Sequence, residues 1–410
     1  MRDDRGRVLV VLPRADHVRG YAPLVPALAS RGLEPIIVSA ADSVPIPAAG
    51  RRIAVPFYGS VRGRVAWLRL VVRRELAARR LMRSLAPDAI VVPSDVSDAL
   101  LAFVAAARRR RVPVVYVQGV PVFADFPRLN AETHAARSRG RRALGATLEL
   151  LLGMAGIHVA TGAKGVLGSR ADHVIVMDHE QARIHIGAGV AAERVSVTGA
   201  PFVDGLVALR RRFDGDLRRR TLAGAGIDAP VALILTKSLH RLGWTTRAMH
   251  EALVQEMVAA VHAELPGWTC AVKLHPAESV DEYRAFLADG AVRIVQDAPV
   301  EELLLASDVV ISLGTSGAAL SARVLGARLV VVTHPSVPML GAHRDLAADP
   351  ATAGSTVELR ARLRALRTIG GTPWAPPAPD GDTVGSDGRA SERIADALHA
   401  IVQARRSGRS

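Results

Sequence analysis

Two segments in the second half of the chain combine residue types that bind phosphate. A short apolar run ends in Lys-x-His-Pro, and a later run over 308–313 is followed by Gly-Thr-Ser-Gly and small residues. A strand, a glycine-rich turn and a helix direct backbone N–H groups and the positive end of the helix dipole toward an anion. The alternatives are a satisfied strand-end histidine and a plain tight turn. The residues predicted at this anion site are Lys273, His275, Pro276, Gly314, Thr315, Ser316 and Gly317.

A polar loop after the apolar run 231–235 could bring further positive charge to the same site. It contains Lys237, His240 and Arg241, and lysine is unusual here because only three of the 53 Lys and Arg residues are Lys. We predict that these three residues bind the same anion, with an ordinary surface loop as the alternative.

Two positions in the first half could hold a general base. Asp16 and His17 follow an apolar run over 7–12, and Asp95 follows another over 89–92. Histidine accepts a proton near neutral pH, and a neighbouring carboxylate can orient it. We predict His17 as the base, oriented by Asp16, with Asp95 as the rival. A solvated Asp-His loop without a catalytic role is the alternative.

Metal ligands are not expected. The sequence has no Cys pair or His-x-x-x-His with the spacing of a zinc site. Asp-Gly-Asp occurs at 214–216 and 380–382, but both copies lie in segments predicted to be linkers rather than after a strand. We therefore predict a function that needs no metal.

Short apolar runs alternate with helical segments in both halves of the chain. This alternation predicts βαβ units, parallel sheets and an α/β fold. Ligands bind such sheets beyond the carboxyl ends of the strands, where the residues named above occur. The strands are expected near 7–12, 35–39, 89–92, 114–117, 173–177, 194–197, 231–235, 269–274, 292–296, 308–313 and 328–333.

A change in composition separates the two halves. Clustered Arg with Gly and Asp begins near residue 204 and predicts a hinge. The expected domains are 1–205 on the acceptor side, a linker at 206–230, a nucleotide-donor domain at 231–385, and a C-terminal helix and tail at 386–410. Two such halves facing each other would form a cleft.

Composition limits the class of protein. Hydrophobic residues make up 49% of the chain, which excludes a disordered protein, and the net charge is +14. The excess of Arg fits either a GC-rich genome or a basic face for anionic ligands. Nucleic acid is not expected, because no basic stripe with interleaved aromatic residues occurs. One cysteine, Cys270, and a start unlike a signal peptide fit a cytoplasmic location.

One apolar segment raises the question of whether the protein contacts a membrane. Residues 143–163 are mostly apolar and follow the Arg-rich run 137–142, but Glu149, His158 and four Gly interrupt them. These interruptions oppose a membrane-spanning helix. We predict a buried core helix. The alternative is a helix on an anionic membrane surface, which would place the protein peripherally at the inner face of the membrane.

With these features the chain resembles the two-domain GT-B superfamily. It is most similar to a branch that contains the non-hydrolysing UDP-GlcNAc 2-epimerases and bacterial capsule, CDP-glycerol and sialic-acid-type transferases. The resemblance implies two facing Rossmann-like domains with parallel sheets and an interdomain cleft. It rests on HVRGYAPLVPALASRG, VVPSDVSDALLAFVAAARRRRVPVVYVQGV, ERVSVTGAPFVDGL, LTKSLHRLGW, KLHP with GTSGAAL, and GRASERIADAL.

Departures from the epimerase pattern favour the transferases. Gln118 stands where an epimerase has Glu, and epimerisation needs acid and base groups to remove and return a sugar proton. Asp95 matches an epimerase acid, but a transferase could use it equally well as a base. Leu320 and Ser321 replace the Glu pair that holds ribose hydroxyls. We predict a glycosyltransferase that moves a sugar from a nucleotide-activated donor to a hydroxyl of a glycan, lipid or small metabolite. The alternatives are a UDP-sugar 2-epimerase and a non-catalytic nucleotide-sugar-binding relative.

These predictions also fix the expected partners. The nucleotide sugar is a co-substrate, and no other cofactor is expected. The partners are this donor, a glycan, lipid or small-molecule acceptor, and an anionic membrane if the apolar segment contacts one. Monomer and homodimer are both left open.

Overall fold

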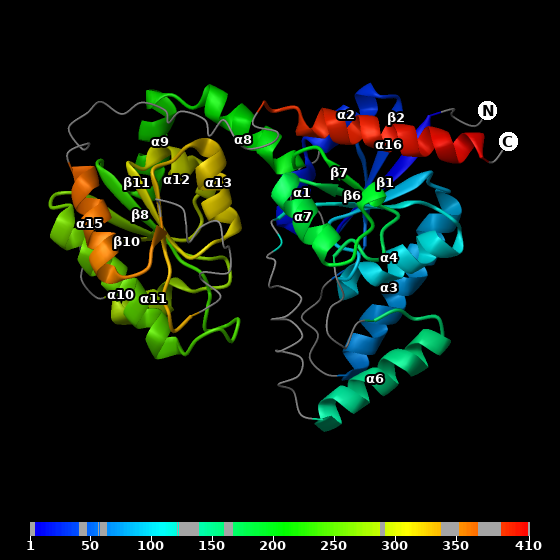
Figure 1. The fold of residues 1–410 in the computed structure, drawn as a ribbon, viewed down its shortest axis with the longest axis horizontal. Coiled ribbons are helices and arrows are strands. Elements are labelled where there is room, and N and C mark those ends of the chain that lie inside the picture. The colour runs from blue at the N-terminus through cyan, green and yellow to red at the C-terminus, as the bar shows by residue number, and fades with distance from the viewer. Residues whose placement is uncertain are drawn as a thin grey trace. The chain divides into compact units, whose positions relative to one another are not determined.

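The computed structural model describes residues 5–40, 47–55, 57, 64–120, 122, 139–159, 167–287, 292–337, 352–367 and 387–408. The chain divides into two compact units. Unit 1 contains Met1–Gly205 and Thr383–Ser410, and unit 2 contains Leu206–Asp382. Each unit has its own sheet with helices on it (Figure 1).

Unit 1 contains a sheet of seven parallel strands in the order β3-β2-β1-β4-β5-β6-β7. The order reverses between β1 and β4. The central strands are buried on both faces, which explains their continuous apolar sequences. The strands are β1 (Gly6–Leu12), β2 (Leu33–Ser39), β3 (Arg51–Ala54), β4 (Ala89–Val92), β5 (Val114–Val117), β6 (His173–Val176) and β7 (Val195–Val197).

Helices cover both faces of this sheet. One apolar core contains residues of α3 and α4, and the other contains residues of α2 and α16. The C-terminal α16 lies beside α2 (Figure 1). The carboxylate of Asp204 fixes the start of α16 by accepting the N–H groups of Ala390 and Ser391 at 2.9 and 2.6 Å. The helices are α1 (Ala15–Tyr21), α2 (Leu24–Ser30), α3 (Arg64–Ser84), α4 (Asp98–Arg109), α6 (Arg139–Met154), α7 (His179–Gly187), the short η1 (Ala192–Arg194) and α16 (Ala390–Ser407).

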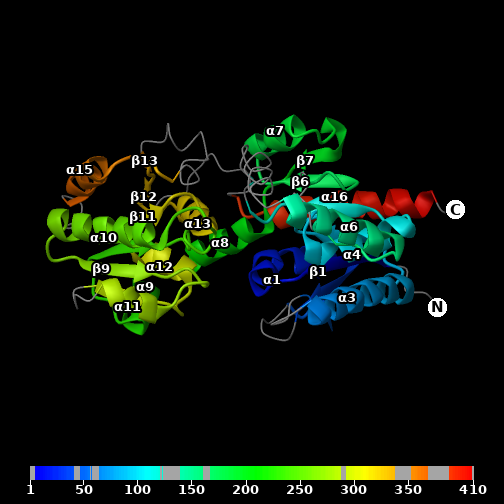
Figure 2. The ribbon, with the colours of Figure 1, turned by 90° about the horizontal axis from the view of Figure 1, so that it is seen from below.

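Unit 2 contains a six-stranded parallel sheet in the order β10-β9-β8-β11-β12-β13. Figure 2 shows β13, β12 and β11 in succession, with β9 farther across this sheet. An apolar core joins the sheet to α10 and α15. The strands are β8 (Val231–Leu235), β9 (Thr269–Lys273), β10 (Val292–Val295), β11 (Val309–Leu313), β12 (Leu329–Val332) and β13 (Thr352–Ala353). The helices are α8 (Pro201–Arg212), which begins in unit 1, α9 (Gly215–Ala225), α10 (Arg247–Glu264), α11 (Val280–Phe286), α12 (Val300–Ala306), α13 (Gly317–Leu325) and α15 (Thr356–Arg367).

This architecture confirms the predicted α/β fold with two Rossmann-like units. The segment 206–230, however, was predicted to be a linker and instead contains α9 and part of α8. Asp214 caps α9 by accepting the N–H of Leu217 at 2.8 Å, and Gly226, with φ +65°, ends it. The Asp and Gly that suggested a linker are therefore helix caps. Asp214 thus has a structural role, and the second Asp-x-Asp, 380–382, lies outside the described residues.

The predicted burial of the apolar segment at 143–163 is wrong. Its helix, α6, ends at Met154, and Gly156, with φ +74°, follows in the turn that terminates it. The N–H of Ile157 donates to the carbonyl of Leu152 at 2.7 Å, and the N–H of Gly156 donates to that of Gly153 at 2.9 Å, which is a Schellman ending. Four large apolar side chains of α6 are exposed. No helix within the described ranges has both the length and the apolar character to cross a bilayer, and residues 160–163 lie outside those ranges.

Candidate functional site

The loop after β8 and the turn after β11 lie at the same edge of the second sheet. These two strands are paired neighbours, and the strand order reverses between them. In open parallel sheets the connections leave in opposite directions at such a reversal, which makes room for a ligand. The structure therefore brings the predicted residues of 236–241 and 314–317 together.

The glycine-rich turn begins α13 and offers one unused hydroxyl. Gly314 has φ +67°, a conformation that favours glycine. Ser316 is the N-cap, and its hydroxyl accepts the N–H of Ala319 at 3.1 Å. The hydroxyl of Thr315 is buried and has no hydrogen-bond partner among the described residues. Gly317, the first helical residue, is exposed, so the N-terminus of α13 is open to a ligand.

Lys237 joins the loop after β8 to this turn. Its Nζ donates to the carbonyl of Thr315 at 2.6 Å and lies 4.7 Å from the ring centroid of Trp244. Burial lowers the pKa of Lys237 to about 8. Within the described ranges no carboxylate pairs with Lys237, and such a cation gains stability when an anion binds beside it.

A buried carboxylate fixes the His275 loop. Glu278 Oε2 accepts the N–H of His275 at 2.9 Å and the hydroxyl of Thr236. Its Oε1 accepts the hydroxyl of Tyr283 at 2.9 Å and lies 3.3 Å from Nε2 of His250. Burial raises the pKa of Glu278, but the hydrogen bonds from His250, Thr236, the His275 N–H and Tyr283 outweigh it, so the pKa ends below its ordinary value. The group is therefore a carboxylate at neutral pH.

The three residues predicted around this loop differ in their exposure to solvent. His275 and Pro276 are exposed in a turn that closes when the N–H of Glu278 donates to the carbonyl of His275 at 2.9 Å. Lys273 is buried, and its Nζ donates to the carbonyls of Gln296 and Leu274 at 2.5 and 3.2 Å. Its ammonium thus binds backbone at β10, and we correct its role from anion ligand to structural cation.

His240 and Arg241 lie in the loop after β8. Arg241 pairs with Glu282 through Nη2 and Oε1 at 2.5 Å. The ring of His240 lies beside that of His250, with centroids 5.0 Å apart. Burial and the neighbouring His250 lower the pKa of His240, which favours its neutral form.

Buried polar atoms without partners gather around this edge of the sheet. Such atoms are rare in folded proteins, because each one loses its hydrogen bonds to water. A bound polar ligand can supply the missing partners. At this edge, the atoms without a partner among the described residues are Thr315 Oγ1, Ser238 Oγ, His240 Nδ1, His250 Nδ1 and Glu282 Oε2, and other such atoms lie elsewhere in the described part of the chain.

The predicted general base lies at the corresponding edge of the first sheet. Asp16 and His17 belong to α1, which follows β1. Asp16 is exposed and accepts a hydrogen bond from Nε of Arg14 at 2.9 Å. The Nδ1 of His17 is buried and lacks a partner in the described part of the chain. Burial lowers the pKa of His17, although the charge of Asp16 opposes this shift.

Asp95 has a structural role instead of the rival base role. It is fully buried, and its two carboxylate oxygens accept the N–H groups of Gly168 and Arg170 at 2.8 and 2.6 Å. A carboxylate in this position holds a loop and does not face solvent. We therefore correct the predicted role of Asp95 from rival general base to a carboxylate that holds a loop.

Replacing Asp95 with Asn tests this role. The new amide N–H₂ would face a backbone N–H, so we expect the free energy of unfolding to fall by about 1–2 kcal/mol. Chemical denaturation measures the change. Asp16→Asn is the control, expected to stay within about 0.5 kcal/mol because its ion pair is exposed. Equal stability of the two variants would contradict the assignment.

Gln118 is also part of the interior of unit 1. Its Oε1 accepts the N–H of Met177 at 3.1 Å, and its Nε2 donates to Oε1 of Gln181. That Oε1 also accepts the N–H of Val122 at 2.7 Å. A glutamate at this position could not donate to Gln181, so the amide satisfies a network that a carboxylate would break.

Several residues of the site escaped sequence reasoning. His250 lies within a helical pattern and Tyr283 in a short amphipathic helix, and neither pattern signals a polar contact. Glu278 follows His-Pro by two residues, which was the available signal. Ser238 and Trp244 lie within the stretch that carried the resemblance.

Comparison with known proteins gives structural matches alone. No family model matches the chain, and no curated protein matches it in sequence. UDP-GlcNAc 2-epimerase from Neisseria meningitidis, bound to UDP-GlcNAc, is similar with a TM-score of 0.61 and 13% identity over 96% of this chain and 99% of that one. The S. aureus MnaA–UDP structure has a TM-score of 0.60 and 15% identity over 97% of both chains. UDP-GlcNAc 2-epimerase from Methanocaldococcus jannaschii, in complex with UDP-GlcNAc and UDP, has a TM-score of 0.59 and 13% identity over 96% of this chain and 99% of that one.

These structures correct the predicted function. Two of the solved structures named above, and others similar to this chain, are UDP-GlcNAc 2-epimerases, which contradicts the prediction of a glycosyltransferase and favours its epimerase alternative. At identities of 12–15% the similarity establishes the fold. The chain has the two-domain, Rossmann-like GT-B fold of the UDP-GlcNAc 2-epimerases.

Proposed function

We propose that the chain binds a UDP-sugar and changes the configuration of the sugar at carbon 2, as a 2-epimerase of the non-hydrolysing type. The observation that carries the proposal is the set of buried atoms at the β8–β11 edge that lack a partner in the described part of the chain, next to Lys237 and the start of α13. The fold supports it, because structures that share this fold along nearly their whole length hold UDP or UDP-GlcNAc.

We assign binding of the nucleotide to unit 2. The N–H groups at the start of α13 and the ammonium of Lys237 suit a diphosphate, because both place positive charge at one point. The hydroxyls of Thr315 and Ser238 can donate to phosphate or ribose oxygens. The Glu278 carboxylate holds the His275 loop in place through the backbone N–H of His275.

We assign to unit 1 the removal and return of the proton at carbon 2 of the sugar. Epimerisation needs a group that removes a proton from carbon 2 and a group that returns one. His17 suits the first role, because burial lowers its pKa and so favours the neutral, basic form at pH 7. Asp16 acts on it through charge, since its hydrogen bond goes to Arg14.

Binding of UDP is expected to depend on the protonation of Lys237. With a pKa of about 8, roughly half of the lysine is neutral at pH 8, and a diphosphate would restore its proton. We expect the complex to take up about half a proton at pH 8 and the affinity to fall as the pH rises further. Titration calorimetry in buffers of different ionisation enthalpy measures the uptake. Lys237→Met should abolish it, and an unchanged uptake would contradict this role.

Product analysis tests the reaction. The protein is incubated with UDP-GlcNAc in D₂O, without an acceptor, and the nucleotide sugar is followed by proton NMR. An epimerase produces UDP-N-acetylmannosamine and incorporates deuterium at carbon 2. If UDP-GlcNAc binds but neither UDP-N-acetylmannosamine nor deuterium at carbon 2 is detected, epimerisation is rejected.

A second candidate is a nucleotide-sugar-binding protein without turnover. The amide of Gln118 and the fully bonded carboxylate of Asp95 favour it, because both occupy positions that resemble acid and base positions of the epimerases. This candidate predicts saturable binding of UDP-GlcNAc with no deuterium exchange, so the same NMR experiment separates the two.

A further inference from the structure

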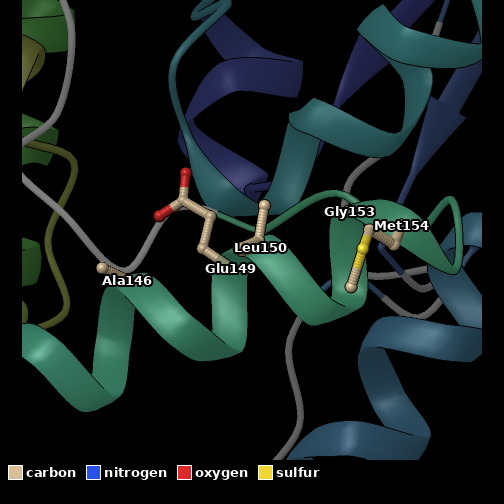
Figure 3. Close-up of a pocket in the computed structure, with 5 residues that line it drawn as sticks. All are labelled: Ala146, Glu149, Leu150, Gly153 and Met154. Carbon is tan, nitrogen blue, oxygen red and sulfur yellow. The ribbon is translucent and has the colours of Figure 1, made fainter.

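Helix α6 exposes an apolar face. Its large exposed side chains are Leu144, Leu150, Leu151 and Met154, with exposed fractions of 59%, 65%, 54% and 71%. Between residues 143 and 154 the exposed positions include no charged residue. Figure 3 shows five residues along the helix that line an open hollow of about 540 Å³: Ala146, Glu149, Leu150, Gly153 and Met154.

Packing within unit 1 does not explain why these apolar side chains of α6 are exposed. In a helix of a globular protein the apolar stripe faces the core and polar residues face water. In α6 the half-buried side includes Leu148 and Leu152, and the opposite side is apolar as well. A contiguous exposed apolar surface of this kind marks an interaction site.

The helix is attached to unit 1 at its C-terminal end. Nη2 of Arg79, in α3, donates to the carbonyl of Gly156 at 2.6 Å. The next turn of chain is held as well, because Nδ1 of His158 lies 3.2 Å from Oε2 of Glu75. Figure 1 shows α6 at the periphery of unit 1, away from its sheet. The apolar face is thus a fixed feature of the unit.

Charge selects the occupant of this face. The start of α6 has Arg at 139, 141 and 142, residue 137 just before it is also Arg, and no acidic residue lies in the first turn of the helix. Each cation near a helix N-terminus opposes the helix dipole, so this arrangement does not help the helix form. It also disfavours pairing with the same basic segment of a second copy. An anionic surface removes both disadvantages.

We propose that α6 docks on an anionic lipid bilayer, with its apolar face at the boundary of headgroups and acyl chains and its arginine-rich start against lipid phosphates. A helix that exposes Leu and Met along its length and begins with Arg combines the apolar surface and the positive charge by which helices bind an anionic membrane surface. The proposal does not depend on the nucleotide-binding function.

Sedimentation of the full chain with vesicles tests the proposal. We expect binding to vesicles of phosphatidylcholine and phosphatidylglycerol in equal parts, weaker binding at high salt, and little binding to pure phosphatidylcholine. The double variant Leu150→Glu, Met154→Glu should lose at least about tenfold in partitioning. Arg141→Gln with Arg142→Gln should lose about fivefold for each Arg on anionic vesicles alone.

Matched controls separate lipid docking from other causes. Val357→Glu changes a side chain of α15 that is 78% exposed and should leave vesicle binding unchanged. Because Leu150, Met154 and Val357 are exposed, the double Glu variant and Val357→Glu should keep the wild-type melting curve. Equal vesicle binding by wild type and the double Glu variant would overturn the proposal. So would a wild-type dimer in light scattering that the double Glu variant converts to monomer, because the face would then belong to a second copy.

Discussion

Replacing Glu278 with Gln is expected to lower the free energy of unfolding by about 3 kcal/mol. The carboxylate accepts hydrogen bonds from the hydroxyls of Thr236 and Tyr283 and from the N–H of His275. A glutamine has one acceptor oxygen, and its N–H₂ would meet one of these donors. Urea unfolding measures the loss.

The pH dependence gives a second measure of the same group. The folded pKa of Glu278 lies below its ordinary value of 4.5. Its contribution to stability is therefore present above that pH and disappears as the pH falls, because the unfolded chain then binds the proton more readily. The difference between wild type and Glu278→Gln should shrink on acidification.

A control and a contradicting result complete this test. Glu251→Gln removes a carboxylate whose ion pair with Arg247 is largely exposed on the arginine side, so a change within about 0.5 kcal/mol is expected. If Glu278→Gln changed stability no more than Glu251→Gln, the buried network would not fix the His275 loop.

Replacing Thr315 with Val is expected to raise stability and weaken UDP binding. The hydroxyl is buried without a partner among the described residues, so its removal should raise the free energy of unfolding by up to about 1 kcal/mol. If that hydroxyl donates to a phosphate, the affinity for UDP should fall about 10- to 100-fold, since hydrogen bonds to charged groups are worth about 1.5–3 kcal/mol. Thermal melting and calorimetry measure the two effects.

The opposite signs distinguish a ligand group from a structural one. A structural hydroxyl would lower stability on removal and leave UDP affinity unchanged. Thr221→Val is the matched control, because its hydroxyl makes a long contact of 3.4 Å with Glu302 on α12. It should change neither quantity measurably. Wild-type affinity in Thr315→Val would remove this residue from the site.

The fold could be predicted where apolar runs are continuous. Central strands such as β1 and β8 are buried on both faces, and their sequences show this directly. The edge strand β3 escaped prediction because its Arg-rich sequence is half exposed, and β13 because it has only two residues. The helix α9 was taken for a linker because its capping Asp214 and Gly226 are also turn residues.

The burial of α6 could not be derived from its sequence. A helix whose residues 143–154 are mostly apolar fits a protein core, a lipid surface or a protein interface equally well. The choice depends on which elements surround the helix, and this is a property of the three-dimensional packing.

The candidate site was predicted in part. The turn at Thr315 and the loop at Lys237 were found from residue types after strands, because parallel strands end at one edge. The direction of a side chain was not available, so Lys273 was assigned to the anion although it binds carbonyls at β10. The pairing of Glu278 with His250 joins the turn before α11 to α10, and only the folded chain brings these two segments together.

One titration tests the central claim that the β8–β11 edge of unit 2 binds the diphosphate of a nucleotide. UDP and uridine are titrated separately into the wild-type protein in a calorimeter. We predict saturable binding of UDP, at least about a hundredfold weaker binding of uridine, and a loss of UDP affinity in Thr315→Val. Absence of UDP binding, or equal affinity for uridine and UDP, would contradict the claim.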